Sequence, residues 1–569
     1  MLAALVLTVF LPAQQPASAL DYLPADSVIC LEASREPWER LGASTRLHAV
    51  LGLQGVQDCL APTLELLASF DDEEGHGFGA SLWNALAYSR MWVAVSVADL
   101  DDARPVMGID LGPGAVLDLD GLFPEAHRRE LAGGTLWRVP RVGAFWREGG
   151  VLIATASFSS GLDASLSDEE YLEGLVHGAR AGGGGLAALP GMRRLRAELA
   201  GGDDLIGVWV PGEALDLDRW RALVPEVDRQ ETETILGVLT ELGLHDLGGF
   251  GWTISVDAPD LLDRSVVYKR GFGGPILRPE VLAAADLPAR AAALPGDTAQ
   301  ARLMAVDLGA ATAELLRLAA IFAELDGQTW PPEGMGEHLE TAQRIASALG
   351  PVVGSCLRAE DLWVSAEDEA LMLGDLWIDI QDPTGLDAAL QRVPDEVERL
   401  LEQGFAVKGK TFASRNRGDR LMILESGAEP TASRLGDTAG FKHGMAPFRD
   451  RLEQGGVVAL DYAGPEFIAL VVQRLRELGG DLDWETMKGV PRIDLLPGFD
   501  ELVKLVGPSA GINLVRPDGL YSEYRSALGY SASNLIGSSA DLMLGFGSWL
   551  EAVEQEAQAS AVPQQDEDF

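Results

Sequence analysis

Short runs of alternating apolar and polar residues follow one another along the chain and are broken by glycine- and proline-rich turns. This alternation is typical of half-buried β-strands. The first half shows it at residues 26–33, 91–97, 105–111, 135–139, 151–157, 205–210, 250–256 and 263–268. Apolar residues at helical spacing lie between them, at 38–70, 192–199 and 213–224. Because hairpins outnumber strand–helix–strand alternations, the pattern predicts an α+β fold with a mostly antiparallel sheet and helices packed on it.

The second half of the chain repeats landmarks of the first in the same order. Leu23-Pro24-Ala25-Asp26 returns as Leu294-Pro295-Gly296-Asp297, and Gly191-Met192 returns as Gly444-Met445. Met91-Trp92-Val93 has a counterpart at 362–364, and Gly133-Gly134-Thr135 has one at 409–411. A closing hairpin ends each half, at 250–268 and at 510–525. We therefore predict two tandem copies of one domain.

The predicted boundaries follow from these landmarks. A leader occupies residues 1–19, copy one 20–276, a linking helix 277–293 and copy two 294–535. Helices are expected at 303–325 and 336–349 within copy two. A terminal helix is expected at 536–556, and the polar, acidic tail 557–569 is expected to be disordered.

The amino terminus has the composition of a secretory signal peptide. An uncharged apolar run at 2–11 precedes Ala17-Ser18-Ala19, a small-x-small cleavage site, although no Lys or Arg stands before the run. We expect cleavage after Ala19. No later segment is apolar over the roughly 20 residues that a spanning helix needs. The mature protein is therefore expected to be exported, periplasmic or extracellular, without stable membrane insertion.

The formal net charge of −43 excludes several classes of partner. Phosphate backbones and anionic membrane surfaces would be repelled, so nucleic-acid binding is not expected. The charge has two remaining interpretations, solubility in a salty medium or attraction to a basic partner, and we favour the first.

The three cysteines do not form a disulfide framework. In an exported protein Cys30 and Cys59 can oxidise to a pair, and whether they do is left open. Cys356 lies in an apolar stretch, where a buried and unreactive thiol is expected.

One segment matches the phosphate-binding P-loop pattern letter for letter. It runs from Gly404 to Gly409-Lys410-Thr411. The motif requires a strand before the loop and a helix after it, whereas here a predicted helix (394–403) precedes and a strand (421–425) follows. We interpret Gly404 as the end of a helix and predict no nucleotide binding.

Metal and catalytic motifs are also missing from the sequence. The seven histidines are scattered singly, and an acidic loop beside His76 is interpreted as solvated. Asp118-Leu119-Asp120-Gly121 with Glu125 resembles part of a calcium loop but has the wrong spacing, so we interpret it as a turn. No serine lies in a nucleophile elbow. We therefore assign no catalytic, cofactor-binding or metal-binding residue and expect no cofactor.

The tryptophans are assigned mainly to the core. Five lie inside predicted strands, at Trp92, Trp209, Trp252, Trp363 and Trp377. Trp146 and Trp330, which we place in loops, are the candidates for exposed, sugar-binding aromatics.

The leader, the Leu-Pro-Ala-Asp opening at 23–26, its counterpart at 294–297 and the two-copy layout resemble a group of exported bacterial proteins known only as domains of unknown function. That resemblance implies no activity and gives no residue a role.

We conclude that the chain is an exported, non-catalytic binding or scaffold protein of the bacterial cell envelope, with an unknown envelope protein or a small ligand as its partner. Two alternatives remain. A carrier of lipid or lipoprotein cargo would have a dry apolar pocket against a curved sheet. An envelope hydrolase would have a cleft with convergent carboxylates of perturbed pKa. The scaffold interpretation predicts a broad exposed patch instead.

Overall fold

The computed structural model describes residues 18–62, 90–97, 103–358, 375–392 and 415–527, with shorter gaps inside the third and fifth ranges, the largest at 222–235. Eighteen strands of this part of the chain form a single sheet. Every pairing between them is antiparallel. The predicted α+β class with a mostly antiparallel sheet is confirmed.

The strands of the first half pair in a fixed order across the sheet. From the outer edge inward they are β4 (His127–Leu131), β5 (Gly134–Val139), β6 (Gly143–Glu148), β7 (Val151–Thr155), β3 (Ala103–Asp110), β2 (Arg90–Val97), β1 (Ser27–Ser34), β8 (Asp204–Pro211), β9 (Leu247–Asp257) and β10 (Asp260–Lys269).

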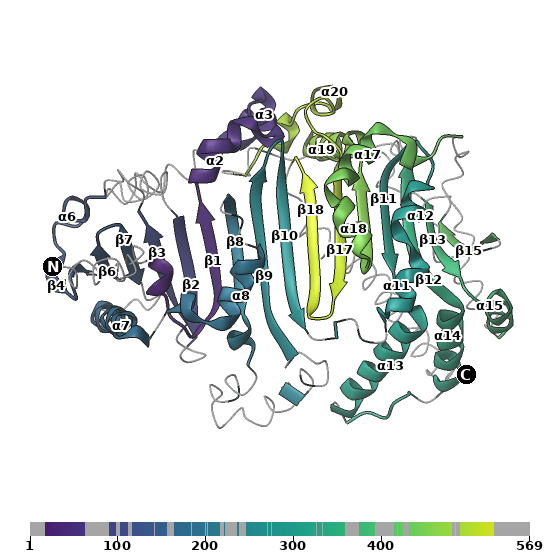
Figure 1. Ribbon diagram of the computed structural model, residues 1–569, viewed down its shortest axis with the longest axis horizontal. Helices are drawn as coiled ribbons and strands as arrows, with labels where there is room; N and C mark the ends of the chain where they lie inside the picture. The colour runs from purple at the N-terminus through teal and green to yellow at the C-terminus, as the bar shows by residue number, and fades with distance from the viewer. Residues whose placement is uncertain are drawn as a thin grey trace, which may run out of the picture.

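The second half continues the sheet from β10. Its strands follow as β18 (Gly519–Ser526), β17 (Ser509–Arg516), β16 (Val457–Ala463), β11 (Thr298–Ala305), β12 (Leu349–Arg358), β13 (Asp375–Ile380), β15 (Arg420–Leu424) and β14 (Arg415–Arg417). Outward from the β10–β18 joint, each half places its last three strands first and then its first three. Figure 1 shows this joint near the middle of the sheet.

Local contacts at the start of the two halves also correspond. The Ser27 hydroxyl donates to the Pro24 carbonyl at 2.6 Å, and the Thr298 hydroxyl donates to the Pro295 carbonyl at 2.6 Å. In the first half the Leu23 carbonyl accepts the Leu186 N–H at 2.9 Å. In the second half the Leu294 carbonyl accepts the Leu435 N–H at 2.7 Å.

Helices cover most of one face of the sheet and the ends of its strands, and a second core that includes Leu119 packs on the other face against Ile109 and Leu152. Those packed on the face seen in Figure 1 are α7 (Ala164–Gly178), α8 (Pro190–Leu199), α11 (Pro279–Ala285), α12 (Leu287–Ala292), α17 (Ala439–Met445) and α18 (Arg449–Gln454). The remaining named helices are α2 (Glu36–Leu41), α3 (Arg46–Leu51), α6 (Leu119–Leu122), α13 (Leu308–Leu325), α14 (Gly336–Ala348), α15 (Pro383–Leu390), α19 (Pro465–Gly480) and α20 (Phe499–Leu502). No helix of the described residues is long and apolar enough to cross a bilayer.

The main hydrophobic core lies between this face of the sheet and its helices and runs through both halves. Trp92, Trp209 and Leu195 belong to it in the first half, and Leu303 and Phe448 in the second. All five side chains are almost fully buried. The single core explains why the two halves form one continuous body.

Several predicted boundaries differ from the structure. Residues 303–305 belong to β11, so the helix expected at 303–325 begins only at Leu308. The strands expected at 135–139 and 151–157, which follow each other in the sequence-based order, are separated by a third strand, β6, which pairs with both. The linking helix is two helices, because Asp286 adopts a left-handed conformation with φ of 39°. The segments 362–364, 404–411 and 536–569 lie outside the described residues.

Candidate functional site

The opposite face of strands β1, β2, β8 and β9 carries only apolar side chains at its outward positions. Cross-strand pairing places Leu31 beside Val93 and Val208, and Val208 beside Trp252. The complete set, which we name the open apolar face, is Ile29, Leu31, Ala33, Met91, Val93, Val95, Ile206, Val208, Val210, Phe250, Trp252 and Ile254.

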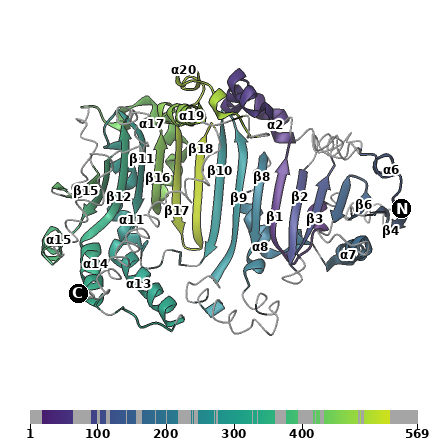
Figure 2. The same ribbon diagram turned by 180° about the vertical axis from the view of Figure 1, so that it is seen from behind.

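This surface is open to solvent in the described part of the structure. Figure 2 shows β1, β8 and β9 from this side without a described helix across their centre. Leu31 and Ile206 are each 45% exposed, and the remaining members are half-buried. At strand and residue spacings, twelve such positions cover about 400 Å². The largest apolar patch on an ordinary monomer is of about this size, and such patches are often functional.

The open apolar face results from a simple property of the sequence. On β8 and β9 an apolar set faces outward, while the helix-facing set is mixed and on β9 includes Gly251, Thr253 and Ser255. Trp209 is fully buried while Val208 and Val210 are half-buried. Sequence alternation alone therefore could not indicate which side of these strands is covered. We expected Trp252 in the core, which is wrong, since it lies half-buried on this open face.

Polar residues border the open apolar face at the joint between the halves. The Trp252 indole N–H donates to Asp263 Oδ1 at 2.8 Å, which fixes the ring at the edge of the patch. Asp263 pairs across the joint with Tyr524. Beyond it the same side of the sheet carries Arg302, whose Nε donates to Asp461 at 2.9 Å. The open apolar face thus ends at this polar border, and Met304, Val353 and Ile378 form a separate apolar row on the same side of the second half.

These bordering carboxyls do not form a hydrolytic pair. Asp263 and Asp461 lie on strands separated by two others, β18 and β17. At the usual spacing of adjacent strands their backbones are about 14 Å apart. Glycosidase carboxyls need to lie within about 5–10 Å of each other.

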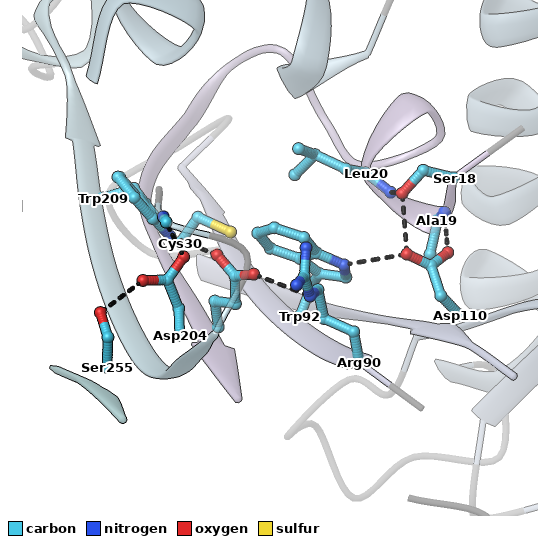
Figure 3. Close-up of polar contacts among 12 residues, drawn as sticks. Ser18, Ala19, Leu20, Cys30, Arg90, Trp92, Asp110, Asp204, Trp209 and Ser255 are labelled. Atoms are coloured by element: carbon cyan, nitrogen blue, oxygen red, sulfur yellow. Dashed lines mark hydrogen bonds and ion pairs between the residues drawn. The ribbon is translucent and has the colours of Figure 1, made fainter. Parts of the chain in front are cut away.

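A second polar cluster is buried on the helix-covered side of the same strands, and Figure 3 shows it in detail. Glu32 is 2% exposed. It accepts the Trp209 indole N–H at 3.0 Å and lies 3.1 Å from Arg90 Nε. Arg196 lies over the Trp92 ring at 5.0 Å. Burial raises the pKa of the Glu32 carboxyl because lost hydration outweighs the charges of Arg90 and Arg196.

Cys30 lies on the same side of β1 as Glu32, two residues before it, and is fully buried. Burial and the Glu32 charge raise the pKa of the thiol, so it stays protonated at neutral pH. A thiolate, not a thiol, is the nucleophile in cysteine catalysis. This cluster therefore has the properties of a structural contact under α8.

The remaining sequence candidates have structural roles or lie outside the described residues. Asp118 caps α6 by accepting the Gly121 N–H at 3.0 Å, and Asp120 accepts the Trp137 indole N–H at 2.8 Å. This segment is a one-turn helix rather than a simple turn. Trp146, placed in a loop from the sequence, lies in β6 and is fully buried, so that prediction is wrong. Trp330 is half-buried in a bend. His76 and the P-loop-like segment fall outside the described residues.

All three cysteines are buried and unpaired. Cys356 is 2% exposed and lies 3.2 Å from the Thr298 hydroxyl, and burial raises its pKa to about 11. The expectation of a buried thiol at this position is confirmed. No group of three potential metal ligands occurs among the residues that the structure describes.

Two hollows lie away from the open apolar face. One of about 700 Å³ lies at the start of α8 and has charges of both signs, including Arg194, Glu213 and Arg221. Another of about 620 Å³ separates α11 and α12 from the end of β17, and Leu282, Leu287, Leu452 and Val515 line it together with other residues. Neither contains a recognisable catalytic set among its described residues.

Comparison with known proteins adds little to this geometry. No protein-family model and no curated protein matches the chain. Three crystal forms of TP0453 are similar over 45% of this chain. Form I covers 79% of that protein at 7% identity and a TM-score of 0.24, and form IV covers 81% at 9% and 0.25. Form III covers 80% at 8% identity and a TM-score of 0.23. These scores are too low to support an argument about fold or function.

Proposed function

We propose that this protein is an exported, non-catalytic binding protein of the bacterial cell envelope, and that a partner protein binds its open apolar face. The observation that carries the proposal is the contiguous apolar surface around Leu31 and Ile206. A scaffold needs such a broad, accessible patch, whereas a small-molecule site is usually concave.

The charge of the chain selects the class of partner. A second copy carries the same net charge of −43, so the two copies would repel each other. An anionic lipid surface would also be repelled. A protein whose apolar surface is bordered by Lys and Arg would instead be attracted. We therefore favour a basic partner protein over self-association or membrane contact.

The two halves are, in this proposal, copies of one ancestral domain. The matching strand order outward from the β10–β18 joint supports this, as do the equivalent Ser27 and Thr298 contacts. The copies differ on the outward side next to the joint, where the second has Arg302 and Asp461. We place the binding face in the first copy, around Leu31 and Ile206.

The experiment compares complexes isolated from the protein's own host envelope by size exclusion and mass spectrometry. Leu31→Asp and Ile206→Asp each place a charge on the open apolar face. Leu315→Asp is the matched control, because Leu315 is 39% exposed on α13 and lies outside that face. We expect a protein partner to co-purify with the wild type and with the control. Salt should weaken this complex, and both face variants should fail to form it.

Other outcomes would contradict the proposal in different ways. A partner that binds the face variants as well as the wild type would place the interface elsewhere. A small bound molecule in place of a protein would favour the carrier, and a homodimer would favour self-association.

A further inference from the structure

The residues around the expected cleavage site are part of the folded core. Ala19 and Leu20 are 0% and 1% exposed. Ala19 packs against Gly108, where a side chain would contact the Ala19 methyl group at 2.9 Å. Cleavage at this point would place the new amino terminus of the mature chain inside the protein rather than on its surface.

One carboxylate holds this segment, as Figure 3 shows. Asp110, at the end of β3, accepts the Ala19 backbone N–H at 2.5 Å and the Ser18 hydroxyl at 2.8 Å. The Trp92 indole N–H is 3.4 Å from the same side chain. Asp110 is itself fixed by pairing of its strand with Arg90 on one side and Val151 on the other.

Hydrolysis after Ala19 would remove two of these donors. The Ala19–Leu20 amide bond breaks, water supplies a hydroxyl to the Ala19 carbonyl and a proton to the Leu20 nitrogen, and a further proton makes that nitrogen an ammonium. Leu20 N lies 3.4 Å from Ser18 Oγ, which in turn contacts Asp110, so the new charge forms within reach of this carboxylate.

We propose that Asp110 is the binding site for the α-ammonium group of the mature chain, formed when a signal peptidase cuts after Ala19. An unpaired buried cation is strongly unfavourable, and a carboxylate that loses two donors needs replacements. The ammonium supplies three N–H donors and the opposite charge. The inference depends on the expected leader and is independent of partner binding at the open apolar face.

The neighbouring residues stay in place without Ser18 and Ala19. The Asp21 carbonyl accepts the Gly185 N–H at 3.0 Å, and the Leu23 carbonyl accepts the Leu186 N–H at 2.9 Å. The Tyr22 ring packs on Trp146 with centroids 4.9 Å apart. These contacts hold Leu20 beside Asp110 after cleavage.

The test uses the full-length chain, exported by its host and purified in mature form. Intact mass and amino-terminal sequencing identify the first residue. An amine-acylating reagent at pH 7 then labels the α-amine in the folded and in the urea-unfolded protein. We expect a chain that begins at Leu20 and labelling at least about tenfold slower when folded, because a buried ion pair must open first.

Two variants separate the ion pair from simple burial. Asp110→Asn should lose most of the protection of the α-amine. Asp21→Asn is the control, since the exposed Asp21 carboxylate accepts only the Ser18 N–H among the side-chain bonds described for it, and that donor leaves with the leader. A mature chain that begins at or before Ser18, or a wild-type α-amine that labels equally fast folded and unfolded, would overturn the proposal. The ratio of the labelling rates of the wild-type α-amine in the unfolded and folded protein tests the proposal even if Asp110→Asn does not fold.

Discussion

Arg264 of β10 lies directly opposite Glu523 of β18, at the joint between the two halves of the sheet. Arg264 donates to the Leu199 carbonyl of α8, and Glu523 accepts the Tyr521 hydroxyl at 2.9 Å. Arg264 thus ties β10 to α8, and Arg451 of α18, 3.7 Å from Glu523, links β18 to its own helix. The register pairs on either side, Asp263 with Tyr524 and Ser265 with Ser522, continue the joint.

On the side of the sheet opposite Arg264 and Glu523, one close packing contact lies next to the joint. The Tyr524 ring lies across Gly511, where a Cβ would stand 2.1 Å from Cδ2 of the ring. Gly511→Ala should therefore displace the ring and destabilise the protein by about 1–3 kcal/mol. Urea denaturation monitored by circular dichroism measures the change.

Gly174→Ala is the matched control for this substitution. Gly174 lies within α7 and has open space around the position of a Cβ. Alanine there should stabilise the helix, by up to about 1 kcal/mol. Equal effects of the two substitutions would contradict the proposed role of Gly511.

The closing hairpins show what the sequence predicts well. Asp257-Ala258-Pro259-Asp260 and Pro517-Asp518-Gly519 are strong turn sequences, and both hairpins form as expected. The open apolar face was not predicted, because alternation on β9 assigns Phe250, Trp252 and Ile254 to the covered side, whereas the structure covers Gly251, Thr253 and Ser255 instead. The contact of Ala19 with Asp110 joins residues 91 positions apart, and no local pattern indicates it.

Ionisation of Glu32 should make the protein less stable as pH rises. Burial raises its pKa in the folded state above the unfolded value, so the folded protein binds the proton more tightly. Stability is then highest below the usual Glu pKa and falls as pH rises through the raised one. Glu32→Gln keeps an acceptor for Trp209 but cannot ionise.

Chemical denaturation at pH 4.5 and pH 8 compares the two proteins. We expect the wild type to lose more stability than Glu32→Gln between these values, by on the order of 1 kcal/mol. A wild type that loses no more stability than the variant over this range would show that Arg90 and Arg196 fully compensate the burial.

The two faces of strands β1 and β8 should respond differently to substitution. Leu31→Ser and Ile206→Ser change residues that remain 45% exposed, so each should cost about 1 kcal/mol or less. Trp209→Ala removes a fully buried ring and should cost at least about 3 kcal/mol. Thermal unfolding measures all three, and large losses at Leu31 and Ile206 would mean that another part of the chain covers them.

The cysteines should all react as thiols once the protein unfolds. Each is buried and free, and burial is the largest cause of the raised pKa of all three. Alkylation of the mature protein, without prior reduction, should label none of the cysteines in the folded state. In urea it should label all three. A mass increase of only one group in urea would show a Cys30–Cys59 disulfide.

Accessibility of the open apolar face inside the envelope is the most direct test of the proposed function. Ile206→Cys places a thiol on that face, and Arg278→Cys is a control on an exposed side chain away from it. Reaction rates with a maleimide are compared between the purified mature protein and the intact host envelope. We predict that Cys at position 206 reacts at least about tenfold more slowly in the envelope, relative to the control, because a partner covers it. The same relative rate in both settings would contradict a binding role for this face.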